Sequence, residues 1–192
     1  MYKRQILPIT DQVLAAVIED LRGILEAERQ LHIAINISAA DIKSGRVLDV
    51  VTQVLSGTSI QARQIWLEAT ERGFMDIDAA RVTISKARAM GHAVAIDDFG
   101  TGYSSLSYLQ GLPMDALKID KSFIDTIDTE SATSSVTPHI IEMARALKLQ
   151  IVAEGVETQA QADYLLAHEV DVGQGWLLSL IHISEPTRLR RI

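Results

Sequence analysis

The feature that most constrains the fold of this chain is a regular alternation between short apolar runs and longer segments with helical spacing. Apolar residues recur three or four positions apart in segments that predict helices, over residues 11–29, 47–55, 77–90, 103–109, 138–147 and 159–168. Short apolar runs between them predict strands, over residues 31–35, 65–67, 93–96, 116–119, 151–153 and 170–172. Strands that alternate with helices pair in parallel and carry the helices on the outside of the sheet. The sequence therefore predicts an α/β fold.

The size and composition of the chain suit one globular domain without disulfides. Its 192 residues, 47% of them hydrophobic, are enough to bury a core. No apolar run reaches the roughly 18 residues of a membrane span, and no signal peptide is visible, so we expect a soluble domain. The absence of cysteine excludes thiolate metal sites. A net charge of −7 argues against nucleic acid as a partner and implies that an anionic substrate would need metal ions.

The two ends of the chain are related through the DNA that can encode them. Residues 1–5 can be encoded by GTG TAT AAG AGA CAG, with GTG as a start codon, and residues 178–182 by CTG TCT CTT ATA CAC. These strings are reverse complements and match the transposon end used in tagmentation sequencing libraries, and residues 183–188 match adapter sequence. We therefore interpret residues 1–5 and 178–192 as translated adapter, although the second segment could also be read as a native strand. Both segments together carry a net charge of +4, so residues 6–177 carry −11.

A polar side chain lies at or just after the end of every predicted strand. The members of this set are Asn36, Glu68, Asp97 with Asp98, Lys118, Glu154 and Gln174. Singly, each has a structural explanation: Asp98 could cap a helix, Glu68 could lie in a turn, and Lys118 could pair with Asp120. Together they favour an active site, because the carboxyl ends of parallel barrel strands are where such sites are built.

The residue types in this set indicate a site for hard divalent cations. Four carboxylates and an amide offer the oxygen ligands that Mg²⁺ and Mn²⁺ prefer. Two such ions can hold the attacking and leaving oxygens of a phosphoryl transfer, and Lys118 could orient a water or neutralise a phosphate oxygen. Gly100 and Gly102 would allow close backbone approach, but they form neither a Walker loop nor a dinucleotide motif. The histidines have no metal-ligand spacing, so we interpret them as structural or surface residues.

Six short motifs, in this order along the chain, resemble the EAL-domain cyclic di-GMP phosphodiesterases. They are Ile35-Asn36-Ile-Ser38, Leu67-Glu68-Ala-Thr-Glu71, Asp97-Asp98-Phe-Gly-Thr-Gly-Tyr-Ser-Ser105, Leu117-Lys118-Ile-Asp120, Ala153-Glu154-Gly-Val-Glu157-Thr158 and Gly173-Gln174-Gly175. The resemblance covers residues 6–177 and implies a partial EAL domain. The family fold is a modified TIM (β/α)8 barrel in which one strand is antiparallel, and this chain would lack the first strand and the last helix.

The resemblance also implies a reaction and a cellular role. Family members use two Mg²⁺ or Mn²⁺ ions to hydrolyse cyclic di-GMP, a bacterial second messenger that regulates biofilms, to linear pGpG. It implies a homodimer for the intact domain and a parent protein with an upstream sensor, GGDEF-like or membrane module. The domain would be cytoplasmic, and the parent could be anchored in the inner membrane.

The resemblance assigns a role to each matching residue. Asn36, Glu68 and Asp97 would bind the first metal, and Asp97 would bridge to a second metal that Asp98 and Glu154 also bind. Lys118 would position the hydrolytic water, with Glu154 as the candidate general base. Glu71 would anchor the loop over residues 99–105, and Gln174 would contact substrate or water.

One family motif is missing. The Glu-Ala-Leu segment, whose glutamate binds the first metal, does not occur in the sequence, and its place would precede Ile6. We therefore expect an active parent enzyme and an inactive 192-residue chain. Two alternatives stay open: a degenerate EAL domain that binds cyclic di-GMP as a receptor, and a TIM-barrel lyase or enolase-like metal enzyme.

Overall fold

The computed structural model describes residues 3–100, 111–127 and 136–179, with side chains from Ile9 onward. Its strands form a six-stranded sheet in the order β1-β2-β3-β4-β5-β6. The pairs β1–β2, β4–β5 and β5–β6 are parallel. Neighbouring strands that follow one another in the chain and run parallel need crossover connections, which the helices provide. The predicted α/β fold is confirmed.

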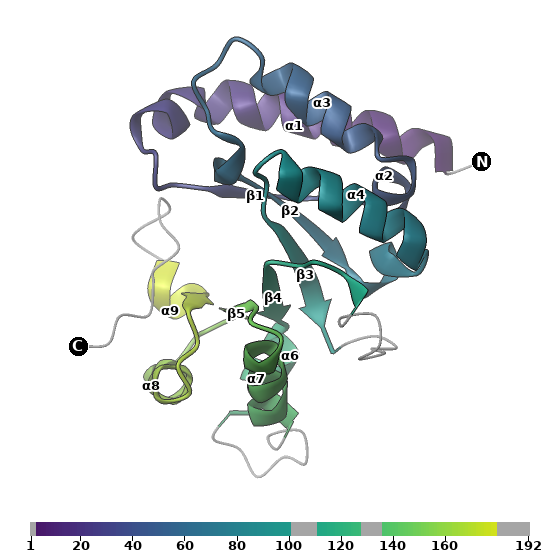
Figure 1. Ribbon diagram of the computed structural model, residues 1–192. Coiled ribbons are helices and arrows are strands. Elements are labelled where there is room, and N and C mark those ends of the chain that lie inside the picture. The colour runs from purple at the N-terminus through teal and green to yellow at the C-terminus, as the bar shows by residue number, and fades with distance from the viewer. Residues whose placement is uncertain (1–2, 101–110, 128–135, 180–192) are drawn as a thin grey trace. The chain divides into compact units, whose positions relative to one another are not determined.

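The elements follow one another in the alternating order that the sequence predicts (Figure 1). The strands are β1 (Ile33–Asn36), β2 (Ile65–Thr70), β3 (Val94–Phe99), β4 (Ala116–Ile119), β5 (Gln150–Glu154) and β6 (Val172–Gln174). The described α-helices are α1 (Lys3–Ala27), α2 (Ala39–Ser44), α3 (Arg46–Leu55), α4 (Ile77–Ala89), α6 (Lys121–Ile124), α7 (Val136–Ala146), α8 (Gln159–Ala167) and α9 (Trp176–Ser179). Two 3₁₀ helices, η1 (Ala62–Gln64) and η2 (Glu71–Phe74), flank β2.

Every predicted strand is present, and five of the six extend past the apolar run that predicted them. β3, for example, continues through Asp97 and Asp98 to Phe99, and β5 includes Glu154. The backbone can continue a strand ladder through a polar residue, because the ladder uses main-chain groups only. The predicted site residues are therefore held by the sheet itself.

The helices differ from the prediction mainly at their ends. α1 begins at Lys3 rather than at residue 11. α7 begins at Val136, two residues before the predicted start at residue 138, because a proline such as Pro138 is tolerated in the first turn of a helix. The predicted helix over residues 103–109 lies outside the described residues. Helices α2, α6 and α9 were not predicted, because four to six residues are too few to show a period.

The chain divides into two compact units. Unit 1 contains Met1–Ala95 and Ser105–Met114, and unit 2 contains Ile96–Ser104 and Asp115–Ile192. Among the described residues, no helix is both long and apolar enough to cross a membrane.

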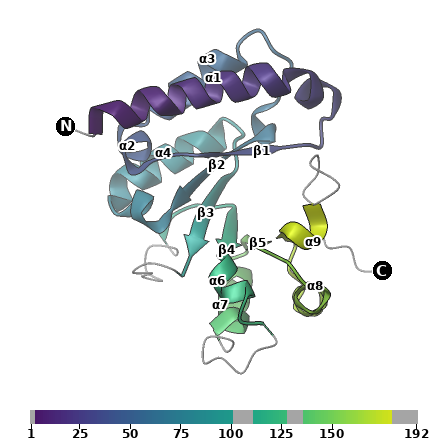
Figure 2. The same ribbon diagram turned by 180° about the vertical axis from the view of Figure 1, so that it is seen from behind.

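In unit 1, helix α1 lies alongside α3, as both views of the ribbon show (Figure 2). The apolar face of α1 buries Leu14 and Leu25 completely. The side-chain amide of Gln64 donates to carbonyl oxygens at and just after the end of this helix, those of Leu25 at 2.8 Å, Glu28 at 3.1 Å and Leu31 at 3.0 Å. Such capping satisfies carbonyl groups that a helix leaves without partners at its last turn.

In unit 2, the core is formed where α6 and α7 pack on β5. The fully buried side chains of this core are Ile96, Leu117, Ile119, Ile124, Ile141 and Ile151. The side chain of Arg145 in α7 donates to the carbonyl oxygen of His168, which follows α8. These contacts pack α6 and α7 on β5, the strand that ends with Glu154.

Candidate active site

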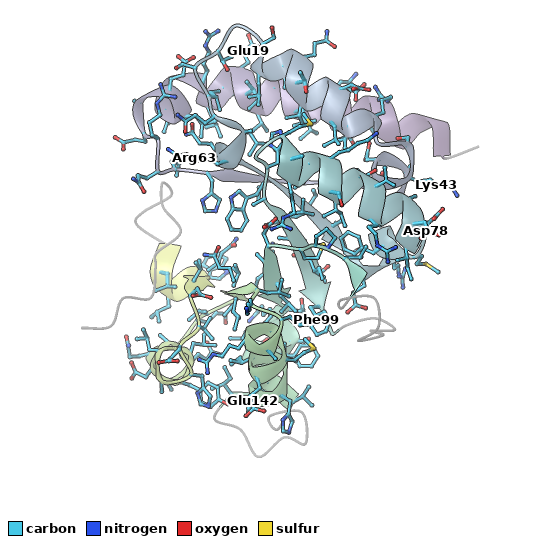
Figure 3. All side chains as sticks on the ribbon, viewed as in Figure 1. Glu19, Lys43, Arg63, Asp78, Phe99 and Glu142 are labelled. Carbon is cyan, nitrogen blue, oxygen red and sulfur yellow. The ribbon has the colours of Figure 1, made fainter. Side chains whose placement is uncertain are left out.

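Two adjacent carboxylates at the end of β3 point toward the same region of unit 2. In a regular strand, Asp97 and Asp98 would point to opposite faces of the sheet. Asp98 instead has a φ of 52°, in the left-handed region that asparagine and aspartate tolerate best after glycine. This local turn brings one oxygen each from Asp97, Asp98 and Glu154 within 4.8 Å of one another. The strand ends at Phe99, a buried residue labelled in Figure 3.

Lys118, near the end of β4, lies between two of these carboxylates. Its Nζ atom is 2.8 Å from Oδ1 of Asp97 and 2.7 Å from Oε1 of Glu154. The side chains of Lys118 and Asp97 are only 9% and 12% exposed, so solvent screens this pair weakly. Because Lys118 is buried, the alternative that it pairs with Asp120 at the protein surface is wrong.

The electrostatics of the cluster favour a cation. The Oδ1 atom of Asp97 is buried and makes no hydrogen bond with good geometry within the described residues, although Lys118 Nζ lies close to it. Partial burial, and then the negative charges of Asp97 and Asp120, raise the pKa of Asp98 above its ordinary value. One ammonium group thus faces three carboxylates, an arrangement that a divalent cation with oxygen ligands would stabilise. The residues of unit 2 fit the metal that the sequence predicts.

Gln174 lies beside Glu154 at the end of the neighbouring strand. The two residues are partners in the parallel register of β5 and β6. The Gln174 backbone carbonyl accepts a hydrogen bond from Val156 at 3.0 Å, while the residue as a whole is exposed. Its side chain is therefore available to contact a ligand at the carboxyl end of the sheet.

The remaining predicted site residues belong to unit 1. Asn36 and Glu68 are partners in the register of β1 and β2, and Glu68 is buried although it carries a carboxylate. The Glu68 carbonyl accepts a hydrogen bond from Ile37 at 2.7 Å. The structure thus brings Asn36 and Glu68 together in this unit, and it excludes the alternative that Glu68 lies in a turn.

Glu71 begins the 3₁₀ helix η2 directly after β2. Of the loop over residues 99–105 that it was predicted to anchor, only Phe99 and Gly100 lie within the described residues. The anchoring role therefore stays a prediction.

The histidines make contacts typical of structural residues. His92 is buried, with Nδ1 3.1 Å from the carbonyl oxygen of Ile65, and burial lowers its pKa. His32 stacks on Trp66 with ring centroids 4.3 Å apart. His168 stacks on Tyr164 at 4.0 Å, and His139 is exposed next to Glu142.

Sequence reasoning missed a lysine next to the site. Lys121, the first residue of α6, is 3.0 Å from Glu157 in the loop that follows β5. Its position three residues after Lys118 places it near the same end of the sheet, but nothing in the local sequence predicts its partner. The left-handed backbone of Asp98 was likewise invisible in the sequence.

Comparisons with known proteins agree with this geometry. The family model described as EAL domain matches residues 3–180. A protein from Escherichia coli K12 named probable cyclic di-GMP phosphodiesterase PdeB is 46% identical over 172 residues, which cover 90% of this chain and 33% of that protein. The cyclic di-GMP phosphodiesterase NbdA of Pseudomonas aeruginosa is 39% identical over 173 residues, covering 89% of this chain and 22% of that protein. The chain thus spans a third or less of the length of these two relatives.

Solved structures show the same fold. The PaMucR phosphodiesterase in complex with c-di-GMP has a TM-score of 0.83 and 37% identity, over 95% of this chain and 73% of that chain. The EAL domain of Mycobacterium smegmatis DcpA has a TM-score of 0.72 and 36% identity, over 84% of this chain and 70% of that chain. Since the family model matches nearly the whole chain, and these neighbours share its barrel-type α/β architecture, the chain belongs to the EAL domain family.

Proposed function

We propose that this EAL domain belongs to a metal-dependent phosphodiesterase that hydrolyses cyclic di-GMP to linear pGpG. The observation that carries the proposal is the cluster in unit 2, where Lys118 lies between Asp97 and Glu154 and Asp98 completes a set of three carboxylates. The names of PdeB and NbdA and the PaMucR complex with c-di-GMP support the choice of substrate.

The proposed reaction is the hydrolysis of one phosphodiester bond. The oxygen of a water molecule forms a bond to phosphorus, and the bond from phosphorus to the ribose 3′ oxygen breaks, which leaves a 5′ phosphate and a 3′ hydroxyl group. Bound Mg²⁺ or Mn²⁺ would supply charge stabilisation for the attacking and leaving oxygens. Asp97, Asp98 and Glu154 would hold the ions on the side of unit 2. Asn36 and Glu68, and the anchoring role of Glu71, remain predictions from the family resemblance.

Lys118 and Glu154 lie close enough together to orient and deprotonate one water molecule. At 2.7 Å from the ammonium group, the Glu154 carboxylate can accept a proton from a water that Lys118 orients. The Lys118 charge would also stabilise negative charge that develops on the phosphate oxygens. Gln174 would contact the substrate or this water.

We further propose that the 192-residue chain is close to inactive as a cyclic di-GMP phosphodiesterase, because it contains no Glu-Ala-Leu segment. The test compares this chain with the same chain extended at its N-terminus by the corresponding segment of the Escherichia coli relative. Both are incubated with cyclic di-GMP and Mg²⁺ or Mn²⁺, and products are separated by ion-exchange chromatography. We expect pGpG from the extended chain at a rate about 10²–10³-fold higher, the effect typical of one electrostatic group in an active site.

Controls separate this proposal from the alternatives. Lys118→Ala and Glu154→Gln in the extended chain should each abolish most turnover while both proteins remain folded by circular dichroism. The receptor alternative would be favoured if cyclic di-GMP bound in the presence of Ca²⁺ and was not hydrolysed in the presence of any metal ion tested. Binding of small carboxylic acids that cyclic di-GMP does not displace would favour the enolase-like alternative.

A further inference from the structure

The loop that directly follows Glu154 is contacted by a lysine that the proposed reaction does not use. Lys121 lies in α6, directly after the loop that follows β4. Its Nζ atom is 2.6 Å from Asp125, four residues later at the end of the same helix, and 3.0 Å from Glu157 in the loop that follows β5. The first ion pair is local, whereas the second joins helix α6 to the loop that follows the neighbouring strand β5.

The aliphatic part of Lys121 also lies against Gly155, the residue that directly follows Glu154. A Cβ atom at Gly155 would come within 2.7 Å of the Cβ and Cδ atoms of Lys121, closer than real Cβ atoms approach. Gly155 also has a φ of 72°, a conformation that glycine adopts without strain. The close approach therefore depends on glycine and places the lysine stem over the backbone next to Glu154.

The opposite side of the same loop is held by main-chain hydrogen bonds. Val156 donates to the carbonyl oxygen of Gln174 at 3.0 Å and accepts from the amide of Leu177 at 3.0 Å. Gly175 lies so close to the Val156 backbone that a Cβ atom there would overlap it. The loop after β5 is thus contacted from the β6 side by backbone and from the β4 side by Lys121.

We propose that Lys121 is a positioning residue that keeps the Glu154 carboxylate beside Lys118 and Asp97. The stem fixes the backbone at Gly155, and the ammonium group fixes the loop through Glu157. The 2.7 Å contact between Glu154 and Lys118 depends on this backbone position, because a displacement of about 1 Å is enough to impair a reacting group. The consequence for catalysis rests on the proposed function, whereas the effect on the loop does not.

If Lys121 only stabilised the fold, its removal would have a different effect on metal binding. The Lys121 and Glu157 side chains are 44% and 42% exposed, and ion pairs at that exposure usually change stability little. A structural role would therefore leave metal binding unchanged. A positioning role would alter metal binding and the loop with little change in overall stability.

The experiment compares variants of Lys121 in the 192-residue chain. Lys121→Ala removes the stem and the charge, Lys121→Met keeps most of the stem, and Lys121→Arg keeps both. Lys43→Ala is the matched control, because Lys43 is an exposed lysine of unit 1, labelled in Figure 3, that pairs with Asp76 at 3.1 Å. Asp125→Ala removes only the local partner.

Two readouts are measured on each variant: hydrogen exchange of the segment over residues 154–158, and Mn²⁺ affinity by titration calorimetry. We expect Lys121→Ala to speed exchange of the Val156 amide and to weaken Mn²⁺ binding about 10-fold, the lower end of the range for residues that orient metal ligands. Lys121→Met should be intermediate. Lys121→Arg and both controls should match the unchanged protein.

A double variant tests whether the effect passes through Glu154. In the Glu154→Ala background, Lys121→Ala should cause no further loss of Mn²⁺ affinity. An equal loss in both backgrounds, or unchanged exchange in Lys121→Ala, would overturn the inference. If the unchanged protein bound no Mn²⁺, the metal site proposed at Asp97, Asp98 and Glu154 would fail instead, and the exchange measurement would still decide the role of Lys121 in the loop.

Discussion

Asp98 has a backbone conformation that is unusual for a residue within a strand. A φ of 52° is unfavourable in free energy for a residue that carries a side chain, whereas glycine adopts it without this cost. The same turn brings its carboxylate near those of Asp97 and Glu154. The site thus combines local backbone strain with repulsion between like charges, both of which are tolerated where they serve binding.

The first prediction separates these two effects at Asp98. Asp98→Ala and Asp98→Gly both remove the carboxylate, but only glycine relieves the backbone. We expect Asp98→Gly to have a free energy of unfolding about 1 kcal/mol higher than Asp98→Ala. Both variants should lose Mn²⁺ affinity equally. Urea unfolding and calorimetry measure these quantities, and equal stability of the two variants would mean that the backbone is not strained.

At the scale of elements, the loops after β5 and β6 meet at Gly175. Val156 bonds both to Gln174 and to Leu177, and these hydrogen bonds require the two backbones to lie in contact. A glycine in a sequence gives no sign of such a contact, since it is equally common in ordinary turns. The contact lies directly after the register pair of Glu154 and Gln174.

The second prediction compares two glycine-to-alanine variants. The added methyl group of Gly175→Ala would overlap the nitrogen and oxygen of Val156, and we expect a loss of about 1–3 kcal/mol in the free energy of unfolding. Gly23→Ala is the matched control, because its methyl group would meet no atom within 4 Å in helix α1. That variant should gain about 0.5–1 kcal/mol from helix propensity. Similar effects of both substitutions in urea unfolding would contradict the close contact at Gly175.

At the scale of the whole molecule, stability should depend on pH through a buried histidine. Burial lowers the pKa of His92, so the unfolded chain binds a proton more readily than the folded chain. Stability is therefore fully present above the ordinary histidine pKa of about 6.5 and falls as the pH drops below it. The carboxylates also titrate in acid, which makes a matched variant necessary.

The third prediction uses His92→Gln, which keeps a side-chain donor but cannot be protonated. We expect the free energy of unfolding of the unchanged protein to fall more steeply than that of His92→Gln between pH 6.5 and 5. Above pH 7 the free energies of unfolding of the two proteins should change with pH in parallel. Urea unfolding at several pH values measures the difference, and identical slopes below pH 6.5 would show that His92 does not contribute.

Much of the fold was predictable because its signals are local. The alternation between segments with helical spacing and short apolar runs located all six strands, and the bounds of β4 agree with the prediction at both ends. Strand ends were less predictable, since residues such as Glu154 continue the ladder through backbone groups that the side-chain pattern does not reveal. The short helices α2 and α6 were missed because they are shorter than two turns.

The sequence by itself determined the family and the identity of the candidate site residues. Residue types and their spacing along the chain are sufficient for both, since strand ends and motifs can be read locally. Only the tertiary structure decided that the carboxylates of Asp97 and Asp98 both lie close to that of Glu154, that Lys118 pairs with Asp97 and Glu154, and that Lys121 lies over Gly155. These contacts depend on one dihedral angle and on the register of strands distant in sequence, and neither is encoded in a local pattern.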